Sequence, residues 1–423
     1  MSGCGRLKLR VLIFAPLLLL IPTGAPAYSV LSHEAVIDAA WDSAIKPLLL
    51  ARYPNSSSND LAEARSYTYG GSIIQDLGYF PLGSVFFTNL LHYVRTGDFV
   101  RAMLREAQNE DEYAFALGAM AHYYGDTLGH ILAVNRSVPI QYPKLRRKYG
   151  PLVTFEEGKK QHVLVEFSFD VVEVAAGDYA PQAYHDFIGF RVAQGLLERA
   201  FKDTYDLEMK DVFIKEDIAI GTFRRAVSKT IPHMTRVAWA QKHDQIEQLI
   251  PNVQRNQFIY RMTRRQYEAQ FGKVYREPDF GAHVLAFFLN LFPKIAFFKF
   301  LSFHPPDPRT EMLFQHSFQV VTERYIAAVR GLNAGATTLS NEDLDTDKPT
   351  ARGEYELADE TYAQLLDRLN ARRFAGVSPQ LREDIIGFYA VRTKGQPDPR
   401  EKRKDWQKTS QQLARLEVAT THD

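Results

Sequence analysis

Apolar residues recur three and four positions apart along most of the chain between residues 28 and 170. This is the period of a helix with one buried face. The segments 33–41 and 112–122 are two examples. Stretches in which apolar and polar residues alternate, as in a half-buried strand, are scarce. Further helices are predicted over 186–201 and 234–249. The pattern therefore predicts an all-α fold.

Polar segments separate the predicted helices. Residues 54–59 form a loop of Pro, Asn and Ser, and Asp60 is expected to cap the helix that follows. Residues 144–148 are interpreted as a short basic loop, a kind of segment that is most often simply solvated. Residues 340–349 are polar almost throughout and are interpreted as part of a linker.

These breaks suggest a division of the chain into parts. We expect one helical domain over residues 28–335, a linker over 336–352, and a C-terminal helical extension with a polar tail over 353–423. The extension should contain one pair of helices, over 357–369 and 379–391. The charged tail beyond that pair is expected to be a solvated helix or disordered.

The segment 281–303 is unusually rich in aromatic and aliphatic residues. Pro293 breaks its helical pattern and two lysines interrupt the apolar run, so the segment is a poor membrane span. Two interpretations remain open. We favour a hairpin of helices buried in the core over an aromatic segment that meets a lipid surface.

The N-terminal 27 residues have the pattern of a secretory signal peptide. Three basic residues precede the almost wholly apolar run 11–21, and small residues then lead up to Ala27. Cleavage after Ala27 would give a secreted or periplasmic protein. The alternative is an uncleaved anchor, although the apolar run is short for a membrane span.

Composition narrows the functional classes. The chain has 423 residues, of which 45% are hydrophobic and 24% charged, as in ordinary globular proteins. Cleavage would remove three positive charges and change the formal net charge from +1 to −2, which argues against a global basic field for nucleic acid. It would also remove Cys4, the only cysteine, and with it any possibility of a disulfide. Bound metal is an obvious alternative means of stabilisation.

Two motifs carry candidate chemistry. The first is His122-x-x-x-Asp126-x-x-x-His130, in which the four-residue spacing is expected to place all three side chains on one face of a helix. Imidazole and carboxylate are common zinc ligands, although a polar network without metal is an alternative. The second is His162-x-x-x-Glu166 in an apolar segment, where a shared metal would offset the cost of burial. Taken alone, such a pair is usually a surface ion pair.

In their order along the chain, these residues resemble the zinc-dependent phospholipase C family, whose fold the fungal single-strand nucleases share. In that family the mature N-terminal residue binds metal through its amine and carbonyl, and a histidine follows shortly. Cleavage after Ala27 would leave Tyr28 first, followed by His33. The family usually has tryptophan at this first position.

The next family ligand is an aspartate in a Gly-rich turn, which corresponds to Asp76 in the segment 70–80, and His92 matches the histidine that follows. The resemblance covers residues 28–170 and implies a multi-helix phospholipase C/nuclease-like bundle with additional C-terminal helices. It implies nine metal ligands: Tyr28, His33, Asp76, His92, His122, Asp126, His130, His162 and Glu166.

The same resemblance implies three zinc ions and no organic cofactor. The implied ligand sets are Asp76, His92, His122 and Asp126 for one ion, Asp126, Tyr28 and His33 for a second, and His130, His162 and Glu166 for the third. The expected enzyme is a zinc-dependent phosphoric diester hydrolase in which zinc activates water. Asp76 is the expected catalytic residue, accepting a proton or orienting the water while also contacting metal.

The expected substrate is a phospholipid or another phosphodiester, with possible contact to a membrane surface. No acidic residue lies between Tyr28 and His33, where the secreted phospholipases bind choline, so the sequence gives no support for that head group. A single-strand nuclease is the runner-up, and the net charge makes nucleic acid less expected. A non-catalytic, zinc-stabilised binding protein is the third possibility. No obligate protein partner is evident.

Overall fold

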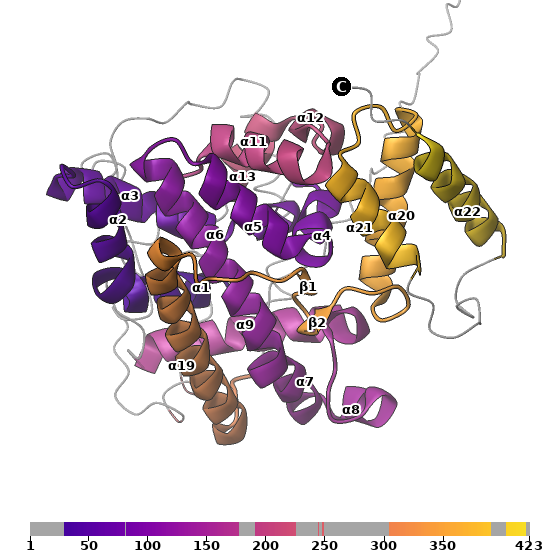
Figure 1. Ribbon diagram of the computed structural model, residues 1–423. Helices are drawn as coiled ribbons and strands as arrows, with labels where there is room; N and C mark the ends of the chain where they lie inside the picture. The colour runs from indigo at the N-terminus through magenta and orange to yellow at the C-terminus, as the bar shows by residue number, and fades with distance from the viewer. Residues whose placement is uncertain are drawn as a thin grey trace, which may run out of the picture.

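The computed structural model describes residues 29–80, 82–176, 191–225, 244, 248, 304–390 and 403–419. Most of these residues lie in helices, and the all-α prediction is confirmed (Figure 1). Among the described residues, strand structure is limited to one short antiparallel pair, β1 (Glu342–Asp343) and β2 (Lys348–Pro349).

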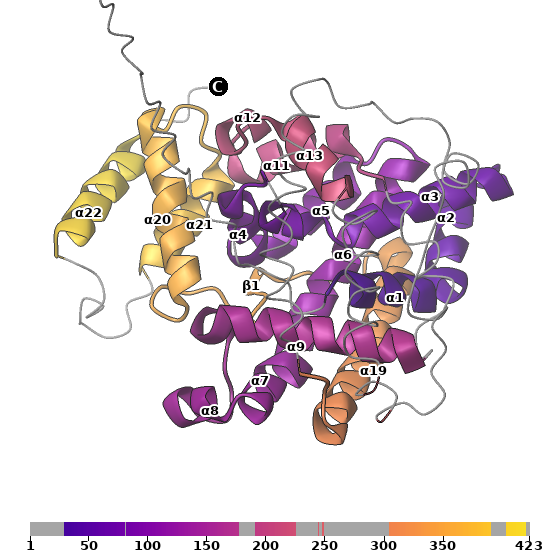
Figure 2. The same cartoon turned by 180° about the vertical axis from the view of Figure 1, so that it is seen from behind.

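The first half of the described chain is built around the long helix α6. Its helices are, in order, α1 (Val30–Ala40), the π-helix η1 (Trp41–Ile45), α2 (Lys46–Arg52), α3 (Ser58–Gly71), the 3-10 helix η2 (Ile74–Tyr79), α4 (Val85–Tyr93), α5 (Thr96–Glu106), α6 (Glu110–Gly129), the π-helix η3 (His130–Val134), α7 (Asn135–Gln141), α8 (Pro143–Tyr149) and α9 (Phe155–Ala176). Figure 2 shows α9 running across the molecule below α6.

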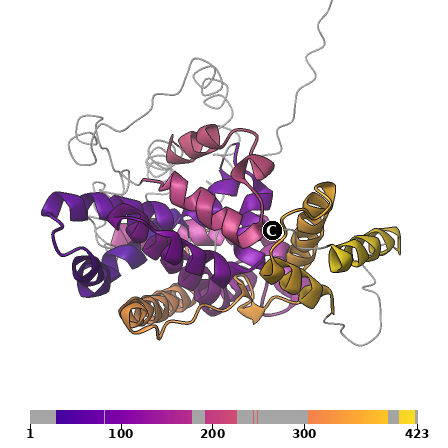
Figure 3. The ribbon, with the colours of Figure 1, turned by 45° about the horizontal axis from the view of Figure 1, so that its top comes forward.

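The later helices cover the outside of this arrangement. They are α11 (Gln194–Tyr205), α12 (Met209–Val212), α13 (Glu216–Arg225), α19 (Pro308–Gly331), the 3-10 helix η6 (Leu332–Ala334), α20 (Glu356–Ala371), α21 (Pro379–Ala390) and α22 (Arg403–Val418). Figure 3 looks onto α11 to α13, with α22 at the outer edge of the molecule.

Helix α6 is buried on most sides because α1, α3, α5 and α19 all pack against it. Its crossing with α3 depends on two glycines. A Cβ atom at Gly118 would lie 2.0 Å from the carbonyl oxygen of Thr68, and one at Gly71 would lie 2.0 Å from that of Phe115. Only glycine permits so close a backbone approach. The crossing brings η2, which follows α3, into contact with α6.

Several local predictions need correction. The cap of α3 is Ser57, whose hydroxyl accepts the N–H of Asp60, while the Asp60 carboxylate accepts the N–H of Ser57. Asp60 is thus the second half of a capping box and not the cap itself. The basic residues 144–148 lie in helix α8 and not in a loop. The helix expected from residue 186 begins at Gln194 within the described residues.

The helices α20, α21 and α22 form a group at one side of the molecule, referred to below as the C-terminal group (Figure 1). The predicted helical pair is present as α20 and α21. The tail, which was expected to be a solvated helix or disordered, contains the helix α22, which packs against α20 and buries Leu416 completely. This burial explains why α22 forms, because its apolar stripe has a surface to cover.

The segment interpreted as a linker is not solvated throughout. Leu344 is fully buried, and its backbone N–H donates to the carbonyl oxygen of His92 at 3.1 Å. The division into domains stays a prediction. The signal peptide, the segment 281–303 and most of the helix predicted over 234–249 lie outside the described residues. Within the part of the chain that is described, no helix is both long and apolar enough to cross a membrane.

Candidate metal centre

Eight of the nine predicted ligands lie among the described residues, and the fold brings all eight into one buried region. They come from α1 (His33), η2 (Asp76), α4 (His92), α6 (His122 and Asp126), η3 (His130) and α9 (His162 and Glu166). Each exposes at most 2% of its surface. The ninth, Tyr28, lies outside the described residues.

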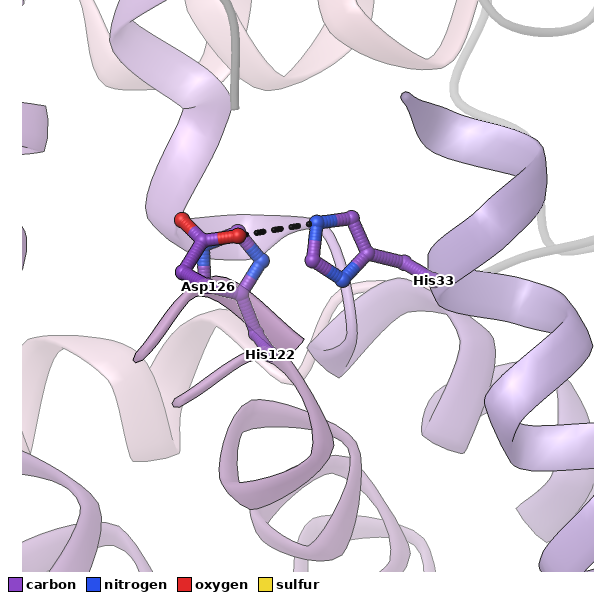
Figure 4. A group of neighbouring side chains, drawn as sticks. All are labelled: His33, His122 and Asp126. Carbon is purple, nitrogen blue, oxygen red and sulfur yellow. Dashed lines mark ion pairs between the residues drawn. The ribbon is translucent and has the colours of Figure 1, made fainter. Parts of the chain in front are cut away.

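Asp126 stands at the junction of two ligand groups. Its Oδ1 atom lies 3.3 Å from His33 Nε2 (Figure 4). Its Oδ2 atom lies 3.1 Å from His92 Nε2 and 3.1 Å from His122 Nε2. The two oxygens of one carboxylate therefore face different histidines, which is the arrangement expected of a carboxylate that bridges two metal ions.

Asp76 completes the group on the His92 side. Its Oδ1 atom lies 3.5 Å from His92 Nε2, and its Oδ2 atom lies 3.9 Å from His122 Nδ1. Asp76, His92 and His122 offer ligand atoms that all lie within 4.8 Å of one another, as do His33, His122 and Asp126. His122 therefore stands between the two groups and can serve either.

The third group contains His130, His162 and Glu166, again with ligand atoms within 4.8 Å of one another. The sequence placed His130 on one face with His122 and Asp126, but the structure separates it from them. Eight residues span roughly 12 Å of helix axis, which is too far for one metal ion to bridge. In addition, α6 gives way to the π-helix η3 at His130.

Backbone carbonyl groups orient three of the histidines. His92 Nδ1 donates to the carbonyl oxygen of Thr88 at 2.8 Å, and His122 Nδ1 donates to that of Ser72 at 3.0 Å. Both rings therefore direct Nε2 toward Asp126. A hydrogen bond to the far ring nitrogen is the usual way in which proteins orient a metal-binding histidine.

His162 is held in the opposite sense. Its Nε2 atom donates to the carbonyl oxygen of Val153 at 2.6 Å, so Nδ1 faces Glu166 Oε1 at 3.6 Å. Burial, followed by the charge of His130, lowers the pKa of His162 to about 3. The ring is therefore neutral at physiological pH, as a metal ligand must be.

His122 and His92 have pKa values shifted in opposite directions. Burial lowers the pKa of His122 to about 4, although the Asp126 carboxylate opposes this. Burial would also lower the pKa of His92, but the hydrogen bond and charge of Asp126 and the charge of Asp76 outweigh it and raise the pKa to about 9. His92 is thus the group that carries a proton when no metal competes for its nitrogen.

The pKa values and hydrogen bonds of the carboxylates indicate whether the site suits metal ions. Burial raises the pKa of Asp76 and of Glu166 well above the usual values, and repulsion from Asp126 adds to both. The oxygens of Asp76 and Glu166 make no hydrogen bonds within the described part of the chain. Buried carboxylates without hydrogen-bond donors are costly. Divalent cations would remove that cost, so the donor set fits zinc.

Sequence reasoning missed Asp170, which lies one turn of α9 beyond Glu166. Its Oδ2 accepts the N–H of Leu31 at 3.1 Å, and its Oδ1 accepts the N–H of Ser32 at 3.1 Å and the hydroxyl of Ser32. A carboxylate at a helix N-terminus satisfies otherwise unpaired N–H groups. Asp170 thereby fixes the end of α1 that places His33. The four-residue spacing from Glu166 was an available signal.

A second missed residue is Asp345, between β1 and β2. Its Oδ1 atom lies 3.0 Å from His130 Nε2, and the residue is 2% exposed. No local signal marks it, because it lies in a polar segment far along the chain. Within the described residues, the groups of side chains spaced for a metal ion contain only the predicted ligands.

The match to a known protein family falls on the part of the chain that contains these ligands. The family described as zinc dependent phospholipase C matches residues 32–215, a range that contains all eight described ligands. No curated protein and no solved structure matches the chain. The three ligand groups are compatible with the metal that the family requires. Residues 32–215 of this chain are therefore similar to the zinc-dependent phospholipase C family.

Proposed function

We propose that this protein is a secreted zinc hydrolase that cleaves the head-group phosphodiester of phospholipids, as a phospholipase C does. The observation that carries the proposal is the position of Asp126, whose two oxygens face different histidines inside a buried set of ligand side chains. A bridging carboxylate suits a hydrolase with several metal ions. The family match supports hydrolytic chemistry.

We assign three zinc ions, because the described ligands fall into three groups. Asp76, His92, His122 and Asp126 would hold one, Asp126 and His33 a second together with Tyr28, and His130, His162 and Glu166 the third. Bound zinc supplies Lewis acidity, which makes water more acidic and neutralises the charge that builds on phosphate oxygens.

Asp76 is the residue that we assign to accept the proton of the attacking water. Before zinc binds, burial and the charge of Asp126 raise its pKa above that of an exposed aspartate. A carboxylate beside the attacking water can accept its proton. Its two oxygens have no hydrogen-bond donor among the described residues, which leaves them available to a water molecule.

The substrate class follows from the family, and the products would be a phosphomonoester and diacylglycerol. No observation favours the nuclease alternative. The basic residues 144–148 form an exposed side of the short helix α8, and a short basic helix is most often simply solvated.

Export with cleavage after Ala27 is part of the proposal. Helix α1 begins at Val30 with Ser29 as its cap residue, two residues beyond the expected new terminus at Tyr28. His33 lies four residues, or roughly 6 Å along the helix axis, from that cap. A free terminal amine at Tyr28 would precede that cap by one residue, and we propose it as a further ligand of the ion held by His33 and Asp126. N-terminal sequencing of exported protein should begin at Tyr28, and any other start removes this ligand.

The substrate test uses the zinc-loaded full-length mature protein. It is incubated with phosphatidylcholine vesicles, phosphatidylinositol vesicles and single-stranded DNA, and the release of phosphomonoester and diacylglycerol is measured. We expect diacylglycerol from at least one lipid. Asp76→Asn should lower the rate by about 10²- to 10⁴-fold because the proton acceptor is lost.

Each other outcome has a clear meaning. Cleavage of DNA without cleavage of either lipid would replace the proposal with the nuclease function. Bound zinc with no turnover of any of the three substrates would indicate a non-catalytic, zinc-stabilised protein. A normal rate in Asp76→Asn would remove Asp76 from the mechanism.

A further inference from the structure

The turn between β1 and β2 carries Asp345 into the metal centre from a part of the chain outside the family match. Figure 1 shows this strand pair between α9 and the C-terminal group. The pair lies against α4 and α5, and α4 is the helix that carries His92. Leu344 is fully buried, so the turn is anchored by an apolar side chain.

Four of the hydrogen bonds among the described residues hold Asp345 and its backbone. The hydroxyl groups of Tyr93 and Tyr355 donate to Oδ2 at 2.9 and 2.6 Å. The Asp345 N–H donates to Asp343 Oδ1 at 2.8 Å, which also accepts the N–H of Thr346. The Asp345 carbonyl oxygen accepts a hydrogen bond from Asn135 Nδ2 at 3.0 Å. Both tyrosine hydroxyl groups reach the same oxygen, Oδ2, and Oδ1 faces His130 in the centre.

Oδ1 and His130 Nε2 are placed as two ligands of one ion would be. They lie 3.0 Å apart, yet His130 Nε2 makes no hydrogen bond within the described structure. Asp126 and its histidine neighbours, which are expected to share zinc, lie 3.1 to 3.3 Å apart. Ligand bonds of about 2.1 Å place neighbouring ligand atoms about 3.0 to 3.4 Å apart. The Asp345–His130 separation belongs to this range.

The charge in the region supports the same conclusion. Asp345 adds a buried carboxylate to a centre that already contains Asp76, Asp126 and Glu166. The two hydroxyl donors reach Oδ2 and stabilise the carboxylate only in part, because Oδ1 faces His130 Nε2 at 3.0 Å instead of a hydroxyl group. A cation next to Oδ1 would complete its pairing.

We infer that Asp345 is a fourth protein ligand of the metal position formed by His130, His162 and Glu166. The inference rests on the zinc binding proposed above. It gives that position two histidines and two carboxylates, a donor set that suits zinc. It also ties the β1–β2 turn and Tyr355, the residue that precedes α20, to the metal content of the centre.

The test compares Asp345→Asn with Asp347→Asn in the zinc-loaded full chain. Asparagine keeps the size of the side chain and can still accept from the two tyrosines, so the fold should survive. Asp347 lies in the same turn but is exposed, and its left-handed backbone (φ 55°) tolerates asparagine well. Zinc per chain is measured by elemental analysis after equilibration in a series of zinc-buffered solutions.

We expect Asp345→Asn to bind one zinc ion fewer than the wild type at low free zinc, through a loss of at least about 10-fold in affinity at one site. Asp347→Asn should bind as the wild type does. Tyr355→Phe, which removes one donor to Oδ2, should weaken the same site by a smaller factor. These measurements do not depend on turnover.

Equal zinc binding by Asp345→Asn and Asp347→Asn would overturn the inference and leave Asp345 as an orienting neighbour of His130. If Asp345→Asn loses its fold by circular dichroism, Tyr355→Phe decides the question by the same zinc titration. A wild-type protein that binds no zinc would instead refute the proposed function. The two failures are therefore distinguishable.

Discussion

The metal centre and the C-terminal group bury different kinds of side chain. The centre encloses histidines and carboxylates with less than 3% exposure. The C-terminal group buries leucines and stacked aromatic rings. The rings of Tyr362 and Phe388 lie 3.7 Å apart between centroids and are tilted by only 5°, and Leu365, Leu369 and Leu381 are fully buried around them.

This difference separates two sources of stability. Apolar side chains in the C-terminal group stabilise the fold by leaving water, and they need no ligand. Burial raises the pKa values of Asp76 and Glu166 in the centre, and repulsion from Asp126 adds to both shifts. Without bound cations, these buried carboxylates lower the free energy of unfolding. Metal should therefore stabilise the centre and leave the C-terminal group nearly unchanged.

The largest effect is expected from Asp126→Asn. The change removes a charged oxygen from the junction of two ligand groups, so both groups lose affinity for zinc. We expect the zinc content to fall by at least one ion and turnover to fall by about 10²-fold or more. Elemental analysis and a phosphodiesterase assay would measure this. Asp42→Asn, at an exposed position of η1, is the control and should behave as the wild type.

Chelation of the metal should show in a single experiment whether the metal centre and the C-terminal group differ in their dependence on zinc for stability. A ligand present at about 1,000 times its dissociation constant contributes about 4 kcal/mol to stability, and chelation would remove this. We expect faster amide hydrogen exchange in α6 and α9 and little change in α20 and α21. An equal rise in the amide exchange rate of all four helices would mean that the two regions unfold as one unit. The C-terminal group would then depend on the metal as much as the centre does.

Phe388→Ala tests the apolar region alone. The side chain is 4% exposed and stacks on Tyr362, so truncation should cost about 3 to 5 kcal/mol of unfolding free energy. Chemical denaturation would measure the loss. The zinc content of the folded fraction should stay unchanged. Zinc loss at full folding would instead show that packing in the C-terminal group supports the centre directly.

Much of the centre was predictable because helices impose a four-residue repeat. His122 with Asp126, and His162 with Glu166, each lie one turn apart on a helix as expected. The role of His92 came from its order relative to the motifs of a known family. These residues all lie within the first 170 positions, where the sequence resembles that family.

Asp345 was not predictable, because its role depends on a contact with His130, 215 positions earlier in the chain, and polar segments usually remain in solvent. Its neighbour Leu344 is one apolar residue among charged ones, too little to indicate burial. The separation of His130 from Asp126 also escaped prediction. A four-residue spacing gives the face of a helix but not which neighbouring helix each turn meets.

The smallest expected effect concerns pH, and it has opposite signs in the two regions. Zinc ligands must lose protons before they bind metal, so acid should weaken the centre. In the C-terminal group, Asp384 accepts the hydroxyl of Tyr362 at 2.9 Å, and burial raises its pKa from 3.8 to about 6. Because the folded pKa lies above the unfolded one, the protonated carboxyl favours folding. This contribution, about 3 kcal/mol, is fully present below pH 4 and is lost as the pH rises through 6.

Acidification from pH 7 to pH 5 should therefore slow amide exchange in α20 and α21 by more than the intrinsic pH dependence of the exchange reaction does. Zinc release should at the same time speed amide exchange in α6 and α9. Asp384→Asn keeps an acceptor for Tyr362 but cannot ionise, so it should abolish the gain in α20 and α21 and leave the centre as it was. If the wild type and Asp384→Asn showed the same pH dependence in these helices, the gain would not come from Asp384. If the C-terminal group instead lost protection in acid together with the centre, its stability would depend on the metal, and the apolar rings would not be its main support.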